Sequence, residues 1–146
     1  MKKRAFVIAS VLALSIMAAA QVALAQDSMV VNIPFAFVAG NAALPAGEYL
    51  VQSPERGSAV ILVNRMIPDA SVALVTMPTS ARDPQSASKL VFTRYGDRYF
   101  LSKIWKEGYS QGKQLSKSPR EKELTRVASI DKAEVTLVAR LSPARP

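Results

Sequence analysis

Side chains with binding chemistry are most concentrated between residues 103 and 126. This segment holds seven lysines or arginines against three glutamates, a formal charge of +4 within a chain of net charge +8. Positive charge favours anionic neighbours, and a tryptophan and a tyrosine in the same segment provide rings for stacking. The segment predicts a site for anionic lipid or polysaccharide, made of Lys103, Trp105, Lys106, Tyr109, Lys113, Lys117, Arg120, Lys122 and Arg126. The alternative is a solvated surface, because seven cations in 24 positions do not form a dense run.

Catalytic and metal-binding chemistry is restricted by two residue types that the chain lacks, histidine and cysteine. Without them there is no Ser-His-Asp triad, no imidazole or thiolate metal site and no redox-active thiol. We therefore expect a non-enzymatic protein with no metal and no cofactor. A carboxylate pair, as in glycoside hydrolysis, remains the alternative route to an envelope hydrolase. Its candidates are Glu48, Glu55, Asp69, Asp83, Asp97, Glu107, Glu121, Glu123, Asp131 and Glu134.

The aromatic residues just before this segment raise a second binding question. The run "KLVFTRYGDRYFLSKIW" (89–105) mixes rings with cations, as a nucleic-acid platform does. Gly96-Asp97 suits a type II′ turn, because glycine adopts the positive φ that its first central position requires. The predicted cross-strand pairs are Arg94 with Tyr99, Thr93 with Phe100, Phe92 with Leu101 and Leu90 with Lys103. This pairing divides the rings between two faces, so we expect a structural hairpin and no nucleic-acid partner.

The elements that position these side chains are predominantly strands. Apolar or alternating runs bounded by Pro, Gly and Ser predict strands over 29–40, 48–52, 58–65, 71–77 and 133–141, besides the two of the hairpin. One helix follows Ser118, which is a natural N-cap with Pro119 at the first helical position and Glu121 completing a capping box. The chain is thus predicted to be mainly β, an antiparallel sandwich or small barrel of about seven strands with one short helix near the C-terminus.

The N-terminal residues have the pattern of a secretory signal peptide. "MKKR" is followed by an uncharged apolar stretch over 5–20 and by "ALA" ending at Ala25. We expect residues 1–25 to be removed and 26–146 to form a single β-rich domain in the periplasm or outside the cell. Loss of Lys2, Lys3 and Arg4 with the leader reduces the net charge from +8 to +5. Membrane contact of the mature chain is expected to be peripheral at most, and its oligomeric state is left open.

Two stretches resemble a known group of proteins. "VVNIPFAFVAGNAALPAGEYLV" and "VFTRYGDRYFLSKIWKEGYSQGKQLSKSPREKEL" are similar to small exported proteins common in acidobacteria and related soil bacteria. The resemblance extends from about Val30 to Leu124 and rests on motifs that shape a fold. It implies an exported compartment and a shared fold, and it carries over no activity and no functional residue.

The function expected from these observations is that of an exported binding or structural module of the cell envelope that contacts anionic components through its basic segment. A small barrel carrying an apolar ligand is the first alternative, and a carboxylate-based envelope hydrolase is the second. The carrier requires a cavity lined by the interior positions Phe35, Phe37, Leu62, Leu74, Phe92 and Leu137.

Overall fold

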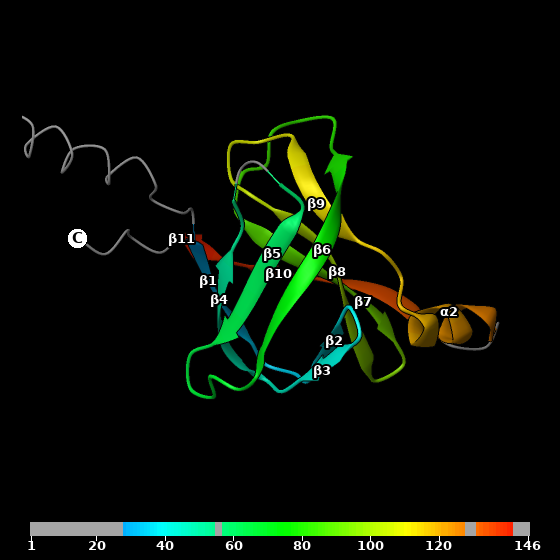
Figure 1. The fold of residues 1–146 in the computed structure, drawn as a ribbon. Helices are drawn as coiled ribbons and strands as arrows, with labels where there is room; N and C mark the ends of the chain where they lie inside the picture. Colours follow the sequence, from blue (N-terminus) through cyan, green and yellow to red (C-terminus); the bar gives the residue numbers. More distant parts are fainter. Residues whose placement is uncertain (1–27, 55–56, 128–130, 142–146) are drawn as a thin grey trace, which may run out of the picture.

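The computed structural model describes residues 28–54, 57–127 and 131–141. The predictions about residues 1–25 and about cleavage after Ala25 lie outside this range. The described chain is mainly β, with one short helix near its C-terminus (Figure 1). Its elements are β1 (Ser28–Ile33), β2 (Phe37–Ala39), β3 (Ala42–Leu44), β4 (Gly47–Gln52), β5 (Ala59–Asn64), β6 (Ser71–Ser80), β7 (Lys89–Tyr95), β8 (Arg98–Trp105), β9 (Gln111–Leu115), α2 (Pro119–Arg126), β10 (Lys132–Val138) and β11 (Arg140–Leu141).

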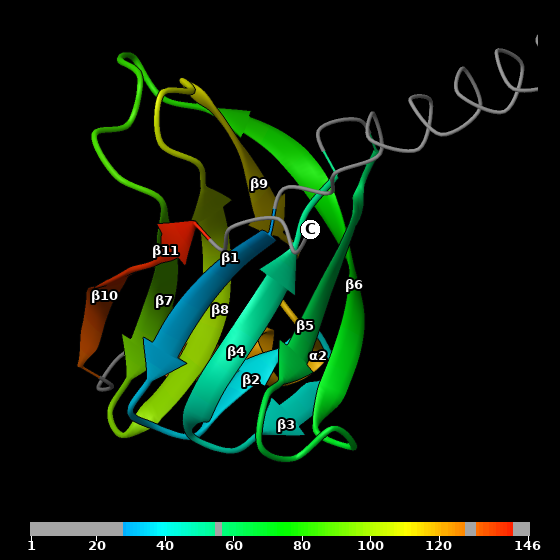
Figure 2. The same cartoon turned by 90° about the vertical axis from the view of Figure 1, so that its left-hand side faces the viewer.

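The strands form two layers that share the long strand β6. We call layer A the strands β11, β1, β4 and β5 with residues 71–75 of β6, and layer B the strands β10, β7, β8 and β9 with residues 76–80 of β6. Figure 2 shows β1, β4 and β5 in front of β7 and β8. On the opposite side, β10 pairs with β7 and β11 with β1, and only Ala139 separates the two strands. The hydrogen-bonded path ends at β10 and β11, so the sheet is open and the architecture is sandwich-like.

The prediction of a mainly β fold with one short helix near the C-terminus is confirmed, and all strand pairs but β2–β8 are antiparallel; the described residues form eleven strands where about seven were predicted. Pro34 has no N–H to donate and divides the predicted strand 29–40 into β1 and β2. Strand β9 was missed, because Gly108 before it and Gly112 within it are typical of a loop. The predicted last strand is interrupted at Ala139, and β6 continues three residues beyond the predicted end at Met77.

The β7–β8 hairpin follows the prediction near its turn and departs from it further along. Gly96 has a φ of 62°, as the predicted turn requires, and the three pairs nearest the turn are those expected. The fourth predicted pair, Leu90 with Lys103, is wrong, because the register shifts between Val91 and Phe92. Leu90 pairs with Ile104 instead, and Ile104 joins it in the core. A β-bulge of this kind turns the following side chains to the other face.

One hydrophobic core fills the space between the layers around Phe92, which is fully buried. The rings of Phe35 and Phe37 meet the Phe92 ring edge-on, with centroids 5.1 and 5.4 Å away. Phe37 also packs against Tyr49, whose hydroxyl donates to the Pro45 carbonyl at 2.6 Å. The six interior positions proposed above all belong to this core or pack against it. They pack into this cluster, and of the six only Phe37 also borders a described hollow.

The helix α2 is held against the turn end of β7 by a buried polar contact. Ser118 caps it as predicted, with its Oγ accepting from the Glu121 backbone N–H at 3.2 Å. The Glu121 carboxylate accepts a hydrogen bond from the Tyr95 hydroxyl at 3.1 Å. Burial, the negative charge of Glu121 and this hydrogen bond raise the pKa of Tyr95 to about 12. A carboxylate that would usually face water therefore fastens the helix to the sheet.

Candidate functional site

The nine residues of the predicted anionic-surface site do not form one patch. Trp105 is buried, and Lys103 lies half-buried on β8 opposite Val91 and Gln114. Three others, Lys106, Tyr109 and Lys113, line a cavity at one end of the sandwich. The remaining four, Lys117, Arg120, Lys122 and Arg126, are exposed on α2 or just before it.

Trp105 has a packing role that its sequence position did not reveal. Its side chain is 7% exposed and lies against Gly112 of the paired strand β9. A Cβ atom added to Gly112 would lie 2.5 Å from the Trp105 ring. The ring therefore occupies the space that a side chain at position 112 would fill. Trp105 is therefore not available to stack on a ligand, as the sequence had suggested. The sequence signal for its packing role is the glycine that pairs with it across the β8–β9 hairpin.

The larger cavity lies between the layers, where β6, β8 and β9 meet the β4–β5 connection. We call it the β8–β9 cavity, and it has a volume of about 500 Å³. Most of its exposed wall is apolar, and the volume is within the range of small-molecule sites. Its lining comprises Met29, Ser53, Pro54, Gly57, Ser58, Thr76, Pro78, Ile104, Lys106, Tyr109, Gln111, Gly112 and Lys113.

Lys113 is the principal polar group of this cavity. Its Nζ donates to the carbonyl oxygens of Pro54 at 2.7 Å and Gly57 at 3.1 Å, which fixes the ammonium beside the β4–β5 connection. Burial lowers the pKa of Lys113, because the charged form loses water. Within the described residues, no carboxylate lies within 4.0 Å of its Nζ. An ammonium has three N–H donors, and the two carbonyls account for two of them.

Lys106 and Tyr109 form the other polar part of the cavity wall. The Lys106 Nζ lies 4.7 Å from the centre of the Tyr109 ring, a cation–π distance. The backbone around Tyr109 is held by hydrogen bonds to the β6–β7 loop, with Gln85 N–H donating to the Tyr109 carbonyl at 3.0 Å. Gly108 N–H donates in turn to the Gln85 carbonyl at 2.8 Å. The loop that carries Lys106 and Tyr109 is therefore bound to the β6–β7 loop by two backbone hydrogen bonds with Gln85.

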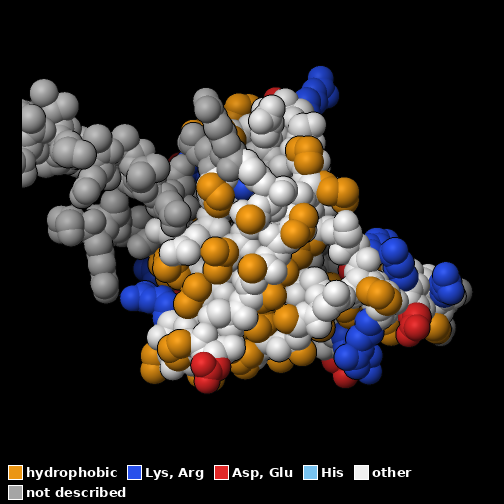
Figure 3. Space-filling model, in the orientation of Figure 1, with side chains coloured by type: hydrophobic (Ala, Val, Ile, Leu, Met, Phe, Trp, Pro, Cys, Tyr) orange, Lys and Arg blue, Asp and Glu red, His pale blue; other side chains and the backbone are white. Residues whose placement is uncertain are grey.

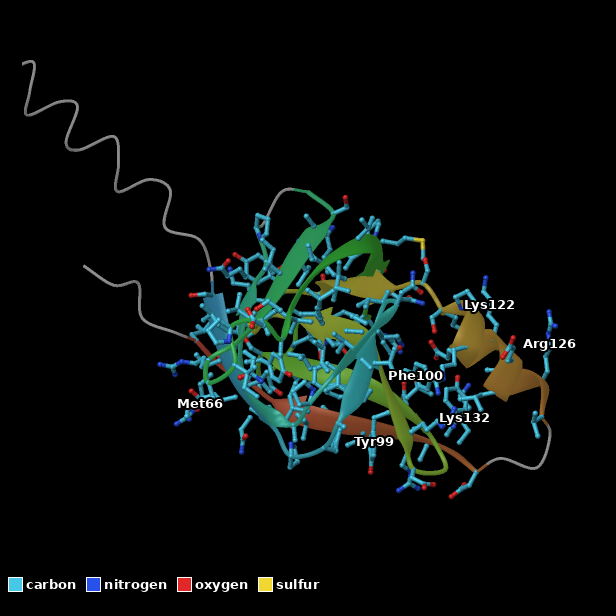
Figure 4. The ribbon with its side chains drawn as sticks, turned by 60° about the horizontal axis from the view of Figure 1, so that its bottom comes forward. Met66, Tyr99, Phe100, Lys122, Arg126 and Lys132 are labelled. Carbon is cyan, nitrogen blue, oxygen red and sulfur yellow. The ribbon has the colours of Figure 1, made fainter. Side chains whose placement is uncertain are left out.

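The second group of cations surrounds α2. Figure 3 shows lysine and arginine side chains gathered where the helix projects from the body of the molecule. Figure 4 shows Lys122, Arg126 and Lys132 at this end. Glu123 is the exposed acid within the helix, and Asp131 pairs with Arg94 at 3.5 Å. We call the exposed side chains of Lys117, Arg120, Lys122, Arg126 and Lys132 the α2 cations; they are solvated and spread along one end of the molecule.

The described residues were considered for acidic clusters that could bind a metal ion or act as a general acid and base. No group of three or more Asp or Glu side chains among them could hold a metal ion. The described lining of the β8–β9 cavity contains no carboxylate, and that of a shallower hollow beside β2 and β8 contains only Asp97. A glycosidase-like mechanism needs two carboxylates in one site. The described lining of neither cavity provides such a pair.

Comparison with known proteins adds no assignment. No protein-family model, no curated protein and no solved structure matches this chain. Within the described residues, no helix is both long enough and apolar enough to cross a membrane. The resemblance to exported acidobacterial proteins remains a prediction from the motifs.

Proposed function

We propose that this chain is an exported, non-enzymatic binding module of the periplasm or cell envelope that takes an anionic amphiphile into the β8–β9 cavity. The observation that carries this proposal is a largely apolar cavity of about 500 Å³ with a partly buried ammonium, Lys113, in its wall. The proposal joins the two properties predicted from the sequence, affinity for anionic envelope components and capacity for an apolar ligand, in a single site.

The apolar walls favour the chain of such a ligand. Met29, Pro78 and Ile104 contribute carbon surface from β1, β6 and β8, so both layers contact whatever enters. Each methylene group transferred from water into such surroundings stabilises a complex by about 0.8 kcal/mol. The cavity lies at the end of the sandwich, whereas the six interior positions first considered for a carrier are filled by their own packing.

The ammonium of Lys113 favours an acidic head group. A carboxylate or phosphate near Nζ would accept the third N–H and would restore the electrostatic stabilisation that burial removes. Hydrogen bonds to charged groups contribute about 1.5–3 kcal/mol, more than a neutral alcohol would gain from the same donor. The site should therefore prefer an acid to an alcohol of equal chain length.

The test compares dodecanoate with dodecanol as probes, by titration calorimetry on the protein purified after export. Lys113→Met should weaken dodecanoate binding by about 10-fold or more and leave dodecanol binding nearly unchanged. Lys117→Met is the matched control, because Lys117 is exposed and outside the cavity lining. Ser58→Trp should weaken the binding of both probes, because the larger side chain would fill part of the cavity. The substitution keeps the backbone carbonyl of residue 58, which accepts hydrogen bonds from the N–H and hydroxyl of Thr76.

The pH dependence supplies an independent check on the role of Lys113. The preference for the acid should fall as the pH rises towards the lowered pKa of Lys113, because the neutral amine no longer attracts an anion. Equal affinity of dodecanoate and dodecanol at neutral pH, or an effect of Lys117→Met as large as that of Lys113→Met, would contradict the proposal. Absence of binding for both probes would remove the cavity as a site for amphiphiles.

A second candidate is peripheral contact of the α2 end with anionic lipid or polysaccharide. The supporting observation is that the α2 cations are all exposed on one end of the molecule (Figures 3 and 4). Sedimentation with vesicles of anionic lipid should show binding in low salt and none in high salt, since exposed contacts are screened. Replacing Lys117, Arg120, Lys122 and Arg126 together by glutamine should abolish that binding, and retention in high salt would exclude this mode.

A further inference from the structure

The outward side of layer A is an apolar surface. On an antiparallel pair, residues opposite each other point to the same side, and the pairs Leu50–Val63, Ile61–Ala73 and Ala59–Val75 all point away from the core. Val75 is 81% exposed and Ile61 is 41% exposed. Figure 3 shows hydrophobic side chains distributed over β4, β5 and β6 on this side. We call this surface the layer A face; its apolar members are Val30, Leu50, Ala59, Ile61, Val63, Ala73 and Val75.

Ionisable groups are nearly missing from this face. Its other outward positions are Ser28, Asn32, Glu48, Gln52 and Ser71 on β1, β4 and β6, and Arg140 on the edge strand β11, opposite Val30. Glu48 lies at the end of the face and is paired with Arg65. An antiparallel sheet that faces water usually alternates apolar inward and polar outward residues, so seven apolar outward positions are unexpected. The described turn after β5 adds Met66, which is 83% exposed, at the edge of this surface (Figure 4).

The charge distribution indicates which partner fits. The chain has a formal net charge of +8, or +5 without residues 1–25, and like charges repel its own copies in most orientations. The helix α2, which carries Arg120, Lys122 and Arg126, lies to one side of the molecule, away from the centre of layer A (Figure 1). Two copies that meet through this face bring together surfaces whose charged positions, Glu48 and Arg140, lie at the margins, and they keep their helices apart. An isologous contact also requires a surface that complements itself. Two sheet faces made of apolar side chains can pack against each other in this way, as they do in the interior of a β-sandwich.

The size of the face sets the strength of this contact. Neighbouring strands are about 4.8 Å apart and rise about 3.3 Å per residue, so four strands of six residues cover roughly 400 Å². A stable complex commonly buries about 800 Å² on each partner. The face therefore supports a weak, reversible dimer more readily than an obligate one.

We propose that the layer A face is a self-association surface, through which two copies pack sheet against sheet. This inference is independent of the amphiphile proposed above, because it uses other residues and requires no ligand.

The test is sedimentation velocity of the ligand-free protein, purified after export, from about 10 μM to about 1 mM, a range suited to a weak complex. The wild type should shift from monomer to dimer within that range. Val75→Lys and Ile61→Lys place a charge within the face and should raise the dissociation constant at least 10-fold. Val138→Lys is the matched control, because Val138 is 67% exposed on β10 of layer B. It should dimerise like the wild type.

Three outcomes would overturn the inference. They are a wild type that stays monomeric at the highest concentration, a dimer that Val75→Lys leaves unchanged, and equal effects of Val75→Lys and Val138→Lys. Loss of binding to uncharged lipid vesicles by Val75→Lys, with the wild type monomeric throughout, would assign the face to lipid instead. If Val75→Lys melts at a lower temperature than the wild type, Val75→Gln tests the same position with a smaller change.

Discussion

The outward sides of layers A and B both bear apolar side chains, but those near the β7–β8 turn of layer B are buried, whereas those of layer A are exposed. On layer B, Thr93, Tyr95 and Phe100 are 7, 4 and 2% exposed, although they point away from the core. On layer A, Ile61 and Val75 are 41 and 81% exposed. The helix α2 contacts the layer B side through Glu121 and Tyr95, whereas no described helix contacts layer A. A strand's own pattern thus does not decide whether its second side is buried; a segment distant in the chain does.

The largest expected effect tests this contrast by truncating one side chain on each outward surface. Phe100→Ala should destabilise the protein by about 3–5 kcal/mol, the range for buried aromatic residues, because Phe100 packs edge-on against Tyr95. Ile61→Ala should cost the monomer less than about 1 kcal/mol, because Ile61 is partly in water already. Urea unfolding at low protein concentration measures both values. Similar losses for the two variants would show that the two surfaces are equally covered.

Gly112→Ala should be the next most disruptive change. The added Cβ would lie within 3 Å of two atoms of the Trp105 ring and of the Ile104 carbonyl oxygen, so ring or strand must move. Overpacking of this kind costs about 1–3 kcal/mol. Thermal unfolding checks the value, and Trp105→Phe in the same chain should recover part of the loss. An unchanged melting temperature for Gly112→Ala would contradict the close contact described.

The contact that fastens α2 predicts a smaller and pH-dependent effect. Tyr95→Phe removes one buried hydrogen bond to Glu121 and should cost about 1 kcal/mol at pH 8. The folded pKa of Tyr95, about 12, exceeds its ordinary value of 10.0, so the folded state keeps a proton that the unfolded state loses. This stabilisation is complete below pH 10 and is lost as the pH rises from 10 to 12. The stability difference between wild type and variant should therefore shrink over that interval in urea titrations, and a constant difference would exclude the linkage.

The smallest effect is expected on the uncovered side. Val75→Lys should change the stability of the dilute protein by no more than about 0.5 kcal/mol, because the side chain is exposed. Urea unfolding near 1 μM, where a weak dimer is dissociated, provides the measurement. A loss of more than 1 kcal/mol at that concentration would mean that Val75 is covered within a single copy.

Much of the fold follows from local signals in the sequence. Gly96-Asp97 defined the hairpin turn, and Ser118-Pro119 with Glu121 defined the start of α2. These features depend on residues close in the chain. The shift of register between Val91 and Phe92 was not predictable, because it arises from how both strands fit the core.

The β8–β9 cavity could not be predicted from the sequence. Lys113 acquires its setting from the carbonyls of Pro54 and Gly57, which lie more than 50 residues earlier. The run "AVILV" (59–63) predicted a strand, and nothing in its letters shows that Ile61 points to water while Leu62 is buried. Both facts depend on which segments lie against each layer, and local patterns contain no information on that.

The short link at Ala139 has a consequence for the order of folding. Ala139 joins β10, paired with β7, to β11, paired with β1, and its N–H donates to the Ser88 carbonyl at 2.8 Å. Strand β1 therefore keeps one side without its partner until the last described residues, Arg140 and Leu141, have been synthesised. Pairings between distant segments form late and slowly. The β1–β11 pairing joins segments more than 100 residues apart and should therefore be among the last pairings of the sheet to form.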